Sequence, residues 1–274
     1  MTDIASIDEP LGGLPLGERV LYQDARLDLA VLEVRFSAAT EPISDHQAEA
    51  FREVLQQNGF YADRVVPASQ SEFRVDVSQG NQIASVTETH GWEYRRSDDQ
   101  AVMFWPTSIA VQAGRGYERW STSLKPPLSA ALGAVQALLG PAMVQRTGVR
   151  YINRLPHRTD SEAAWEGRID PSLLGPMHHP VLGSSIRGAQ QQLDLDLGAG
   201  YGASIRHGIQ PSDNLASDYL LDIDVFDLTT AAFAIESILF IAQRLNRTAM
   251  AIFQQCVTKK LHDEMQPATD SRGE

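Results

Sequence analysis

The residues best suited to chemistry are aspartates that alternate with apolar residues in two short segments. One segment reads Leu-Asp-Leu-Asp-Leu and contains Asp194 and Asp196, and the other reads Leu-Asp-Ile-Asp-Val and contains Asp222 and Asp224. On a strand, such alternation places both aspartates of a segment on one face. Magnesium prefers carboxylate oxygens and is often completed by substrate phosphates. The pattern favours a solvated, salt-bridged face of an antiparallel sheet, and a magnesium site is the alternative.

Two arginines lie four residues apart in the segment Gly-Val-Arg-Tyr-Ile-Asn-Arg-Leu. As a strand, this segment puts Arg150 and Arg154 on one face and Tyr151 and Asn153 on the other. Arg150 and Arg154 can form a strip that binds a phosphate or an acidic partner segment, because guanidinium groups bind such anions through two hydrogen bonds. Together with Arg206 they can instead balance the aspartates. Tyr151 and Asn153 are candidates for ligand binding. Alternatively, Tyr151 is buried between the sheet and a helix, and Asn153 forms hydrogen bonds with the backbone at a strand end.

A glycine-serine turn precedes the first aspartate pair. The segment Gly-Ser-Ser-Ile-Arg-Gly begins at Gly183 and is followed by Asp194 and Asp196, with Asp222 downstream. This order resembles the small nucleotidyltransferases, in which a Gly-Ser turn holds the triphosphate and three strand aspartates hold two metal ions. The resemblance implies that Gly183 and Ser184 contact phosphate and that the three aspartates bind magnesium.

The composition describes an acidic globular protein. Its 274 residues are 43% hydrophobic and 21% charged, which suffices to bury a sizeable core. The 35 acidic and 23 basic residues give a net charge of -12, which argues against non-specific electrostatic binding to nucleic acid or an anionic membrane. A local exception is a basic stripe of Arg146, Arg150, Arg154 and Arg158 on a long strand. A nucleic-acid binder would need this stripe, and we expect a protein or small-ligand partner instead.

Cysteine content and hydropathy indicate a cytoplasmic protein. Cys256 is the only cysteine, so a disulfide framework is excluded and a reducing compartment is expected. On the apolar stripe of a long helix, Cys256 is predicted to be a core residue. The first ten residues are acidic and lack the apolar core of a secretory signal. No apolar run reaches the ~18 residues of a membrane span.

The order of predicted elements repeats along the chain. We expect a flexible lead at 1–20, a first α+β unit at 21–142, a second at 143–265 packed with it as one globular body, and a flexible tail at 266–274. The first unit is predicted to contain strands at 27–36, 73–77, 83–94 and 101–113, with helices starting at Ser44 and Pro126. The second is predicted to contain strands at 144–155, 192–197, 202–210 and 219–226, with helices at 161–174 and 230–257. The fold class is α+β: duplicated strand-helix-antiparallel strands-helix units, with helices on one face of the sheet.

The whole pattern resembles a sporadically distributed, uncharacterised bacterial family with a central Arg-Tyr-x-Asn motif. The motif is present here as Arg150-Tyr151-Ile152-Asn153, and the resemblance extends to the closing aspartate strand and long helix. No reaction follows from this resemblance, but patchy distribution implies mobile or defence-related loci.

We accordingly expect a non-enzymatic binding or regulatory protein of a bacterial defence or stress module, without a cofactor. It would recognise a protein or small ligand through its sheet surface. A magnesium-dependent nucleotidyltransferase-like enzyme is the alternative. The oligomeric state is left open.

Overall fold

One antiparallel sheet runs through both halves of the chain in the computed structural model. The structure describes residues 10–269 except 16, 19, 38–41, 79–80, 98, 157–164 and 212–216. Neighbouring strands follow the order β3-β4-β5-β6-β2-β7-β10-β9-β8, and β11 pairs with β7. The strands are β2 (Leu27–Phe36), β3 (Arg64–Ser78), β4 (Asn81–Arg95), β5 (Gln100–Trp105), β6 (Ser108–Ala113), β7 (Met143–Leu155), β8 (Ala189–Gly198), β9 (Tyr201–Pro211), β10 (Ser217–Asp227) and β11 (Ala231–Ala232).

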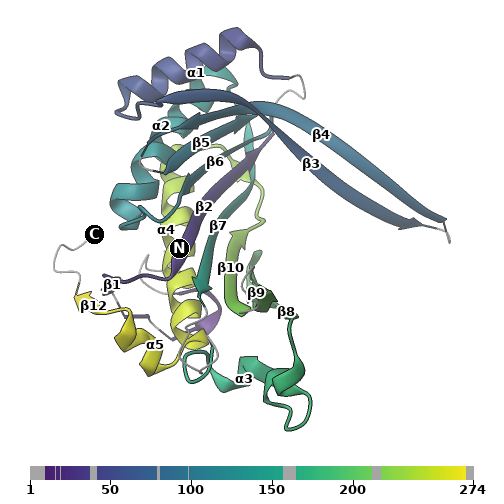
Figure 1. The fold of residues 1–274 in the computed structure, drawn as a ribbon. Helices are drawn as coiled ribbons and strands as arrows, with labels where there is room; N and C mark the ends of the chain where they lie inside the picture. Colours follow the sequence, from purple (N-terminus) through teal and green to yellow (C-terminus); the bar gives the residue numbers. More distant parts are fainter. Residues whose placement is uncertain are drawn as a thin grey trace.

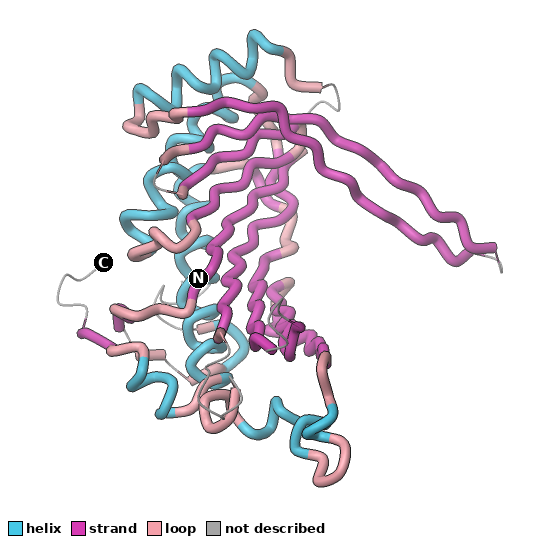
Figure 2. The backbone as a smooth tube through the Cα atoms, in the orientation of Figure 1, coloured by secondary structure: helices cyan, strands magenta, loops and turns pink. Residues whose placement is uncertain are grey.

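The helices lie on one face of this sheet and leave the other face open, as Figures 1 and 2 show. They are α1 (Asp45–Gln57), α2 (Lys125–Leu138), α3 (Pro171–Leu174), α4 (Ile235–Cys256) and α5 (Lys259–Glu264). Short helical turns are η1 (Leu11–Gly13), η2 (Trp120–Leu124), η3 (Gly175–His178) and η4 (Gly183–Ser185). No helix in the described part of the chain is long and apolar enough to cross a membrane.

The two halves repeat one arrangement around the middle of the sheet. β2 opens the first unit and β7 opens the second, and the two strands are antiparallel neighbours. The remaining strands of each unit extend outward, β6 to β3 on one side and β10 to β8 on the other. In each unit a long helix, α2 or α4, follows the last long strand. The predicted α+β class with duplicated units and helices on one face is therefore confirmed.

Local signals in the first unit define most of its boundaries. Ser44 and Gln47 form the predicted capping box at the start of α1. The strand predicted at 101–113 is in fact the hairpin β5–β6, because Pro106 supplies no backbone N–H and begins its turn. β5 pairs only with Trp92–Arg95 of β4. The rest of β4 pairs with β3 alone, and the two strands extend from the body as a long arm (Figure 2).

In the second unit, the strand predictions match more closely than the helix predictions. The helix predicted at 161–174 is only the four-residue α3, and 161–164 lie outside the described residues. The helix predicted from 230 begins at Ile235, because Ala231 and Ala232 pair with β7 as β11. Cys256, at the end of α4, is buried as predicted, and burial raises the pKa of its thiol to about 12.

Parts of the predicted flexible ends belong to the packed body. Leu11 in η1 is buried, and its backbone N–H donates to Thr248 Oγ1 of α4 at 3.2 Å. Strand β1 (Val20–Tyr22) pairs with β12 (Pro267–Thr269) beside α5. These segments matter for function because β1 forms one wall of the cavity described below.

Candidate functional site

The four residues predicted to bind a ligand divide between the two faces of β7. The side chains of Arg150 and Arg154 lie on the open face, where they pair with carboxylates of neighbouring strands. Tyr151 and Asn153 are buried on the face covered by α4. The alternation predicted from the sequence is therefore present, and it separates the set into two surfaces.

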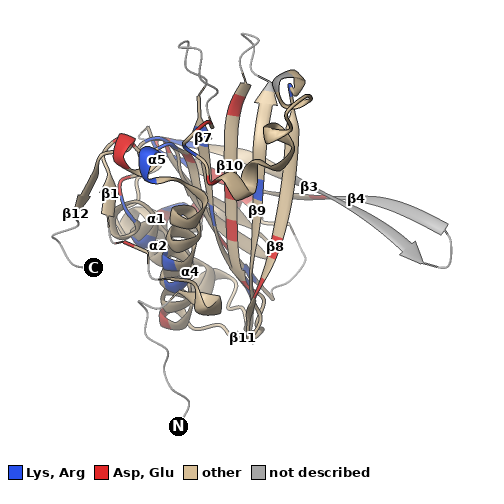
Figure 3. Cartoon of the chain, turned by 90° about the horizontal axis from the view of Figure 1, so that it is seen from below, with Lys and Arg blue, Asp and Glu red and all other residues tan. Residues whose placement is uncertain are grey.

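On the open face, Arg150 and Asp222 form a two-point ion pair across the β7–β10 boundary. Nε and Nη2 of Arg150 each donate to Asp222 at 2.7 Å, and these hydrogen bonds raise the pKa of Arg150. Arg206 on β9 approaches the same carboxylate at 3.4 Å. Asp222 is almost fully buried by these contacts. Figure 3 shows acidic segments on β10 and β8 in red and a basic segment on β9, between them, in blue.

Arg146 continues the ion pairs along β7. Its guanidinium donates to Glu33 of β2 at 2.7 Å and to Asp224 of β10 at 3.0 Å. It therefore bridges the strands on either side of β7. The predicted salt-bridged sheet face is present here.

Arg154 completes the series at the other end of β7. It donates to Asp28 at 2.6 Å and to Asp218 at 3.3 Å, and the bond to Asp28 contributes most to the raised pKa of Arg154. Arg158, the fourth member of the predicted basic stripe, lies outside the described residues. In the described part of the stripe every arginine is neutralised by carboxylates, so this face does not present a strip of unpaired positive charge.

The three aspartates predicted to bind magnesium share a face but are not gathered. Strand β9 separates Asp194 and Asp196 on β8 from Asp222 on β10, which corresponds to roughly 10 Å. Asp194 accepts hydrogen bonds from Gln192, and Asp196 accepts the backbone N–H of Gly198. Within the described residues, no group of three or more His, Cys, Asp or Glu could hold a metal ion. The structure therefore does not bring the three carboxylates together.

The predicted phosphate turn is a closed helical turn. Gly183 and Ser184 lie in η4, and the N–H of Gly183 donates to His179 O at 2.9 Å. The backbone N–H of Ser185 donates to Leu182 O at 2.9 Å. The side chain of Ser184 lies outside the described structure. A cradle for phosphate needs amides that point at the ligand, whereas these two point at carbonyls of their own segment.

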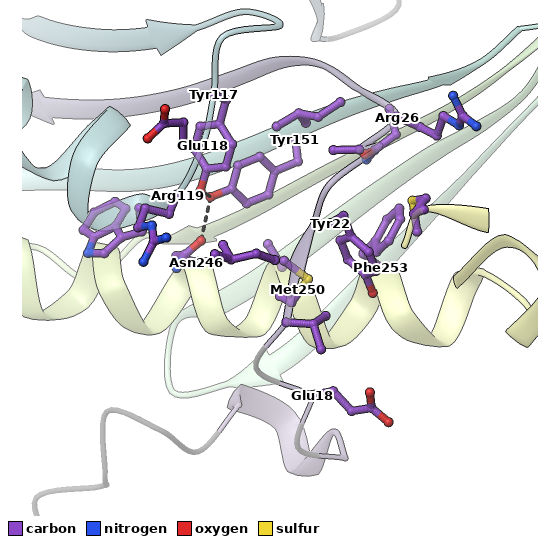
Figure 4. Close-up of a pocket in the computed structure, with 18 of the residues that line it drawn as sticks. Glu18, Tyr22, Arg26, Tyr117, Glu118, Arg119, Tyr151, Asn246, Met250 and Phe253 are labelled. Atoms are coloured by element: carbon purple, nitrogen blue, oxygen red, sulfur yellow. Dashed lines mark hydrogen bonds between the residues drawn. The ribbon is translucent and has the colours of Figure 1, made fainter. Parts of the chain in front are cut away.

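The covered face of β7 holds a cavity of about 140 Å³. It lies between β7, α4, β1 and the segment at 117–120 that leads into η2 (Figure 4). Elements from both units thus contribute to one site. Tyr151 and Asn153 line it, while Arg150 and Arg154 do not.

Two tyrosines and an asparagine form a hydrogen-bonded row along one wall of the cavity. The hydroxyl of Tyr151 donates to Oδ1 of Asn246 on α4 at 2.6 Å, and the hydroxyls of Tyr117 and Tyr151 are 3.2 Å apart. The two rings meet edge to face with centroids 5.8 Å apart. Figure 4 shows the three side chains converging from separate elements. Tyr151 therefore joins the middle of the sheet to the middle of α4.

Two amide side chains offer further polar atoms. Nδ2 of Asn153 donates to the carbonyl of Leu221 at 3.4 Å, which leaves its Oδ1 as an acceptor. Oδ1 of Asn246 accepts the hydrogen bond from Tyr151, which leaves Nδ2 of Asn246 as a donor. In the described part of the structure neither remaining atom has a hydrogen bond. Both residues line the cavity, so one acceptor and one donor are available to a bound molecule.

The rest of the wall is mainly apolar and aromatic. Tyr22 of β1 and Phe253 of α4 pack edge to face at 5.9 Å, and Leu27, Trp120 and Met250 also line the cavity. Burial raises the pKa of the Tyr22 hydroxyl, which keeps it neutral. A flat, mostly apolar molecule fits such walls.

Charged side chains also line the cavity. They are Glu18, Arg26, Glu118, Arg119 and Arg247. Arg26 is held by an ion pair with Asp24 at 3.0 Å. Charges of both signs are present, so these residues do not by themselves select an anion or a cation.

Sequence reasoning missed Asn246, Tyr117 and Tyr22. Asn246 was detectable, because it is a polar residue between Leu245 and Ala249 on the apolar stripe of α4. A buried polar side chain on a core stripe must find a partner, and here the partner is Tyr151. Tyr22 gave no such signal, because it lies between the predicted flexible lead at 1–20 and the strand predicted at 27–36.

The fold and the site describe an α+β protein with one open, salt-bridged sheet face and one covered cavity. No protein-family model matches the sequence, and no curated protein is significantly similar to it. The resemblance to the family with the Arg-Tyr-x-Asn motif stays a prediction. The functional argument therefore depends on the cavity itself.

Proposed function

We propose that this protein is a non-enzymatic binding protein whose ligand occupies the cavity between β7 and α4. The ligand would be a neutral single-ring molecule with an amide or hydroxyl group at one end. The observation that supports the proposal best is the row Tyr117-Tyr151-Asn246, which sets hydrogen-bonding groups into a mainly apolar cavity. A few placed polar groups among apolar walls are typical of small-molecule sites.

The cavity volume indicates the size of the group that the cavity can hold. An apolar cavity of roughly 150 Å³ holds one benzene molecule, and this cavity measures about 140 Å³. A single ring with a small substituent therefore fills it.

The available polar atoms limit the chemistry of the ligand. Nδ2 of Asn246 can donate to a ligand carbonyl or hydroxyl oxygen, and Oδ1 of Asn153 can accept from a ligand N–H or O–H. A primary amide or an alcohol supplies both partners. A carboxylate would leave the acceptor of Asn153 without a donor, so the neutral ligand is favoured.

Neutralisation of the open face supports the covered face as the binding surface. Arg150 and Arg154 would have to exchange existing carboxylate partners for those of a ligand. Binding there would thus lose about as many ion pairs as it gains. The cytoplasmic location and the role in a defence or stress module stay predictions from the sequence.

The test is a thermal-shift screen of the full chain against single-ring amides, alcohols and unsubstituted rings. A ligand that binds only the native state raises the melting temperature by mass action. The double variant Tyr151→Phe/Asn246→Leu removes both partners of one hydrogen bond while keeping shape, which can be nearly neutral for stability. We expect amides and alcohols to stabilise the wild type and to lose this effect in the double variant, whereas unsubstituted rings still bind.

Two control variants locate the binding surface. Tyr61→Phe changes an exposed tyrosine and should leave binding unchanged. Arg150→Gln changes the open face and should also leave it unchanged. Loss of binding in Arg150→Gln with retention in the double variant would overturn the proposal, and so would the absence of any stabilising compound in the screen.

A further inference from the structure

Strand β8 forms one edge of the sheet. It pairs with β9 on one side, and no strand in the described part of the chain pairs with its other side. An edge strand presents unpaired backbone N–H and C=O groups and is a template for another strand. Proteins that remain monomeric usually block such an edge.

The two edges of this sheet differ in how they are protected. β3, at the opposite edge, contains Pro67 and the basic residues Arg64 and Arg74, and proline and basic side chains discourage pairing at an edge. β8 contains no proline, lysine or arginine, and its only irregularity lies between Asp196 and Gly198. Leu193, at the middle of β8, leaves 39% of its surface exposed. This edge therefore lacks the protection found at the other.

The sequence of β8 is complementary to itself in the antiparallel direction. Glutamines occupy 190–192, and Asp194 and Asp196 follow Leu193. If a second copy pairs with Leu193 opposite Leu193, Gln192 faces Asp194 of the other copy and Gln190 faces Asp196. All four side chains then lie on the open face of the sheet. Within one chain, Nε2 of Gln192 already donates to Asp194 at 3.0 Å, so the two groups are chemically suited.

Other registers are less favourable. Moving the symmetry axis to Asp194 would set this carboxylate directly opposite its copy, and facing like charges destabilise a strand pair. A shift by one residue in only one strand would mismatch the apolar and polar faces. The register centred on Leu193 also brings two exposed leucines together on the face that carries the helices. It satisfies both aspartates and covers the apolar surface.

We propose that the protein forms a twofold-symmetric dimer through β8, with Leu193 on the symmetry axis and the sheets of two copies joined into one. Such an isologous interface is the commonest way for a chain to cover a self-complementary surface. The proposal is independent of the ligand cavity, because no residue of β8 lines that cavity.

The first test is the mass of the full chain by size-exclusion chromatography with light scattering at micromolar concentration. We expect twice the chain mass of 30.1 kDa for the wild type. Leu193→Lys places two positive charges on the axis and should yield the monomer. Leu228→Lys, which changes an exposed leucine outside β8, should remain dimeric. A monomeric wild type, or a dimer unchanged by Leu193→Lys, would overturn the proposal.

Disulfide trapping tests the register and does not depend on the folding of the lysine variant. Directly opposite residues of antiparallel strands have Cα atoms about 4.5–5.5 Å apart, within the range of a disulfide. Leu193→Cys should therefore form a covalent dimer with itself under mild oxidation. Gln190→Cys should link to Asp196→Cys in a mixture but not to itself. The natural Cys256 is buried and should not interfere. If Leu193→Cys does not cross-link, or Gln190→Cys links only to itself, the register is wrong.

Discussion

Tyr151 of β7 donates a hydrogen bond of 2.6 Å to Oδ1 of Asn246 at the middle of α4. This bond ties the central strand to the longest helix and forms part of the cavity wall. Its neighbour Arg150 points to the opposite face of the sheet and is held by Asp222. β7 therefore contributes to two surfaces, an open face with ion pairs and a covered face that borders the cavity.

The Tyr151–Asn246 bond should be measurable as a coupling energy. Tyr151→Phe leaves Oδ1 of Asn246 buried without its donor, and we expect a loss of about 1–2 kcal/mol in the free energy of unfolding. Asn246→Leu should cost a similar amount, and the double variant should cost less than the sum of the two. Urea denaturation of the four proteins checks this. Strict additivity would show that the two side chains do not interact, and Tyr61→Phe should stay within about 0.5 kcal/mol of wild type.

The ion pair between Arg150 and Asp222 should contribute more than surface pairs of the same type. The side chain of Asp222 is only 4% exposed, so Arg150→Ala leaves a buried carboxylate with the more distant Arg206 alone. We expect a loss of about 2 kcal/mol or more in the free energy of unfolding. Arg95→Ala removes a more exposed pair with Glu93 and should cost less than Arg150→Ala does. Equal losses for the two variants, measured in urea, would contradict the assigned burial.

The stability of the protein should fall in mild acid because of His207. This side chain is buried on β9, its Nδ1 lies 2.9 Å from the Tyr219 hydroxyl, and burial lowers its pKa below the ordinary 6.5. Below pH 6.5 the unfolded chain gains a proton that the folded protein does not. The contribution of His207 is thus complete above that pH and is lost as the pH falls toward the folded pKa.

Urea denaturation of the wild type and His207→Gln between about pH 8 and about pH 5 tests this contribution. The variant is expected to be less stable than the wild type near pH 8, because it loses the packed ring. Its stability should, however, decrease less on acidification. A parallel decrease in both proteins would assign the acid sensitivity to other groups.

Alternation and capping were sufficient to predict most of the fold. The strict period of two around Asp222 and Arg150 predicted both the strands and the salt-bridged face, because side-chain direction on a strand follows from spacing alone. The capping box at Ser44 located α1 in the same way. These features are local, and local signals are readable in one sequence.

The partners of these residues could not be predicted, because they depend on long-range register. Arg154 pairs with Asp28, which is 126 residues away on β2, and nothing in either segment identifies the other. The cavity combines β1, β7, α4 and the residues before η2, so no single segment carries its pattern. The spacing of the three aspartates could not be predicted for a similar reason, because β9 lies between the aspartate strands and separates their carboxylates.

The most direct test of the cavity as the ligand site is NMR chemical-shift mapping of the full chain. The probe is a single-ring amide or alcohol that stabilises the protein in the thermal-shift screen, and the signals to follow include the side-chain amides of Asn246 and Asn153. The account predicts that both amide signals shift in proportion to occupancy, while backbone signals of Arg206 and Asp222 on the open face do not. Shifts confined to the open face, with the two asparagine amides unchanged, would contradict it.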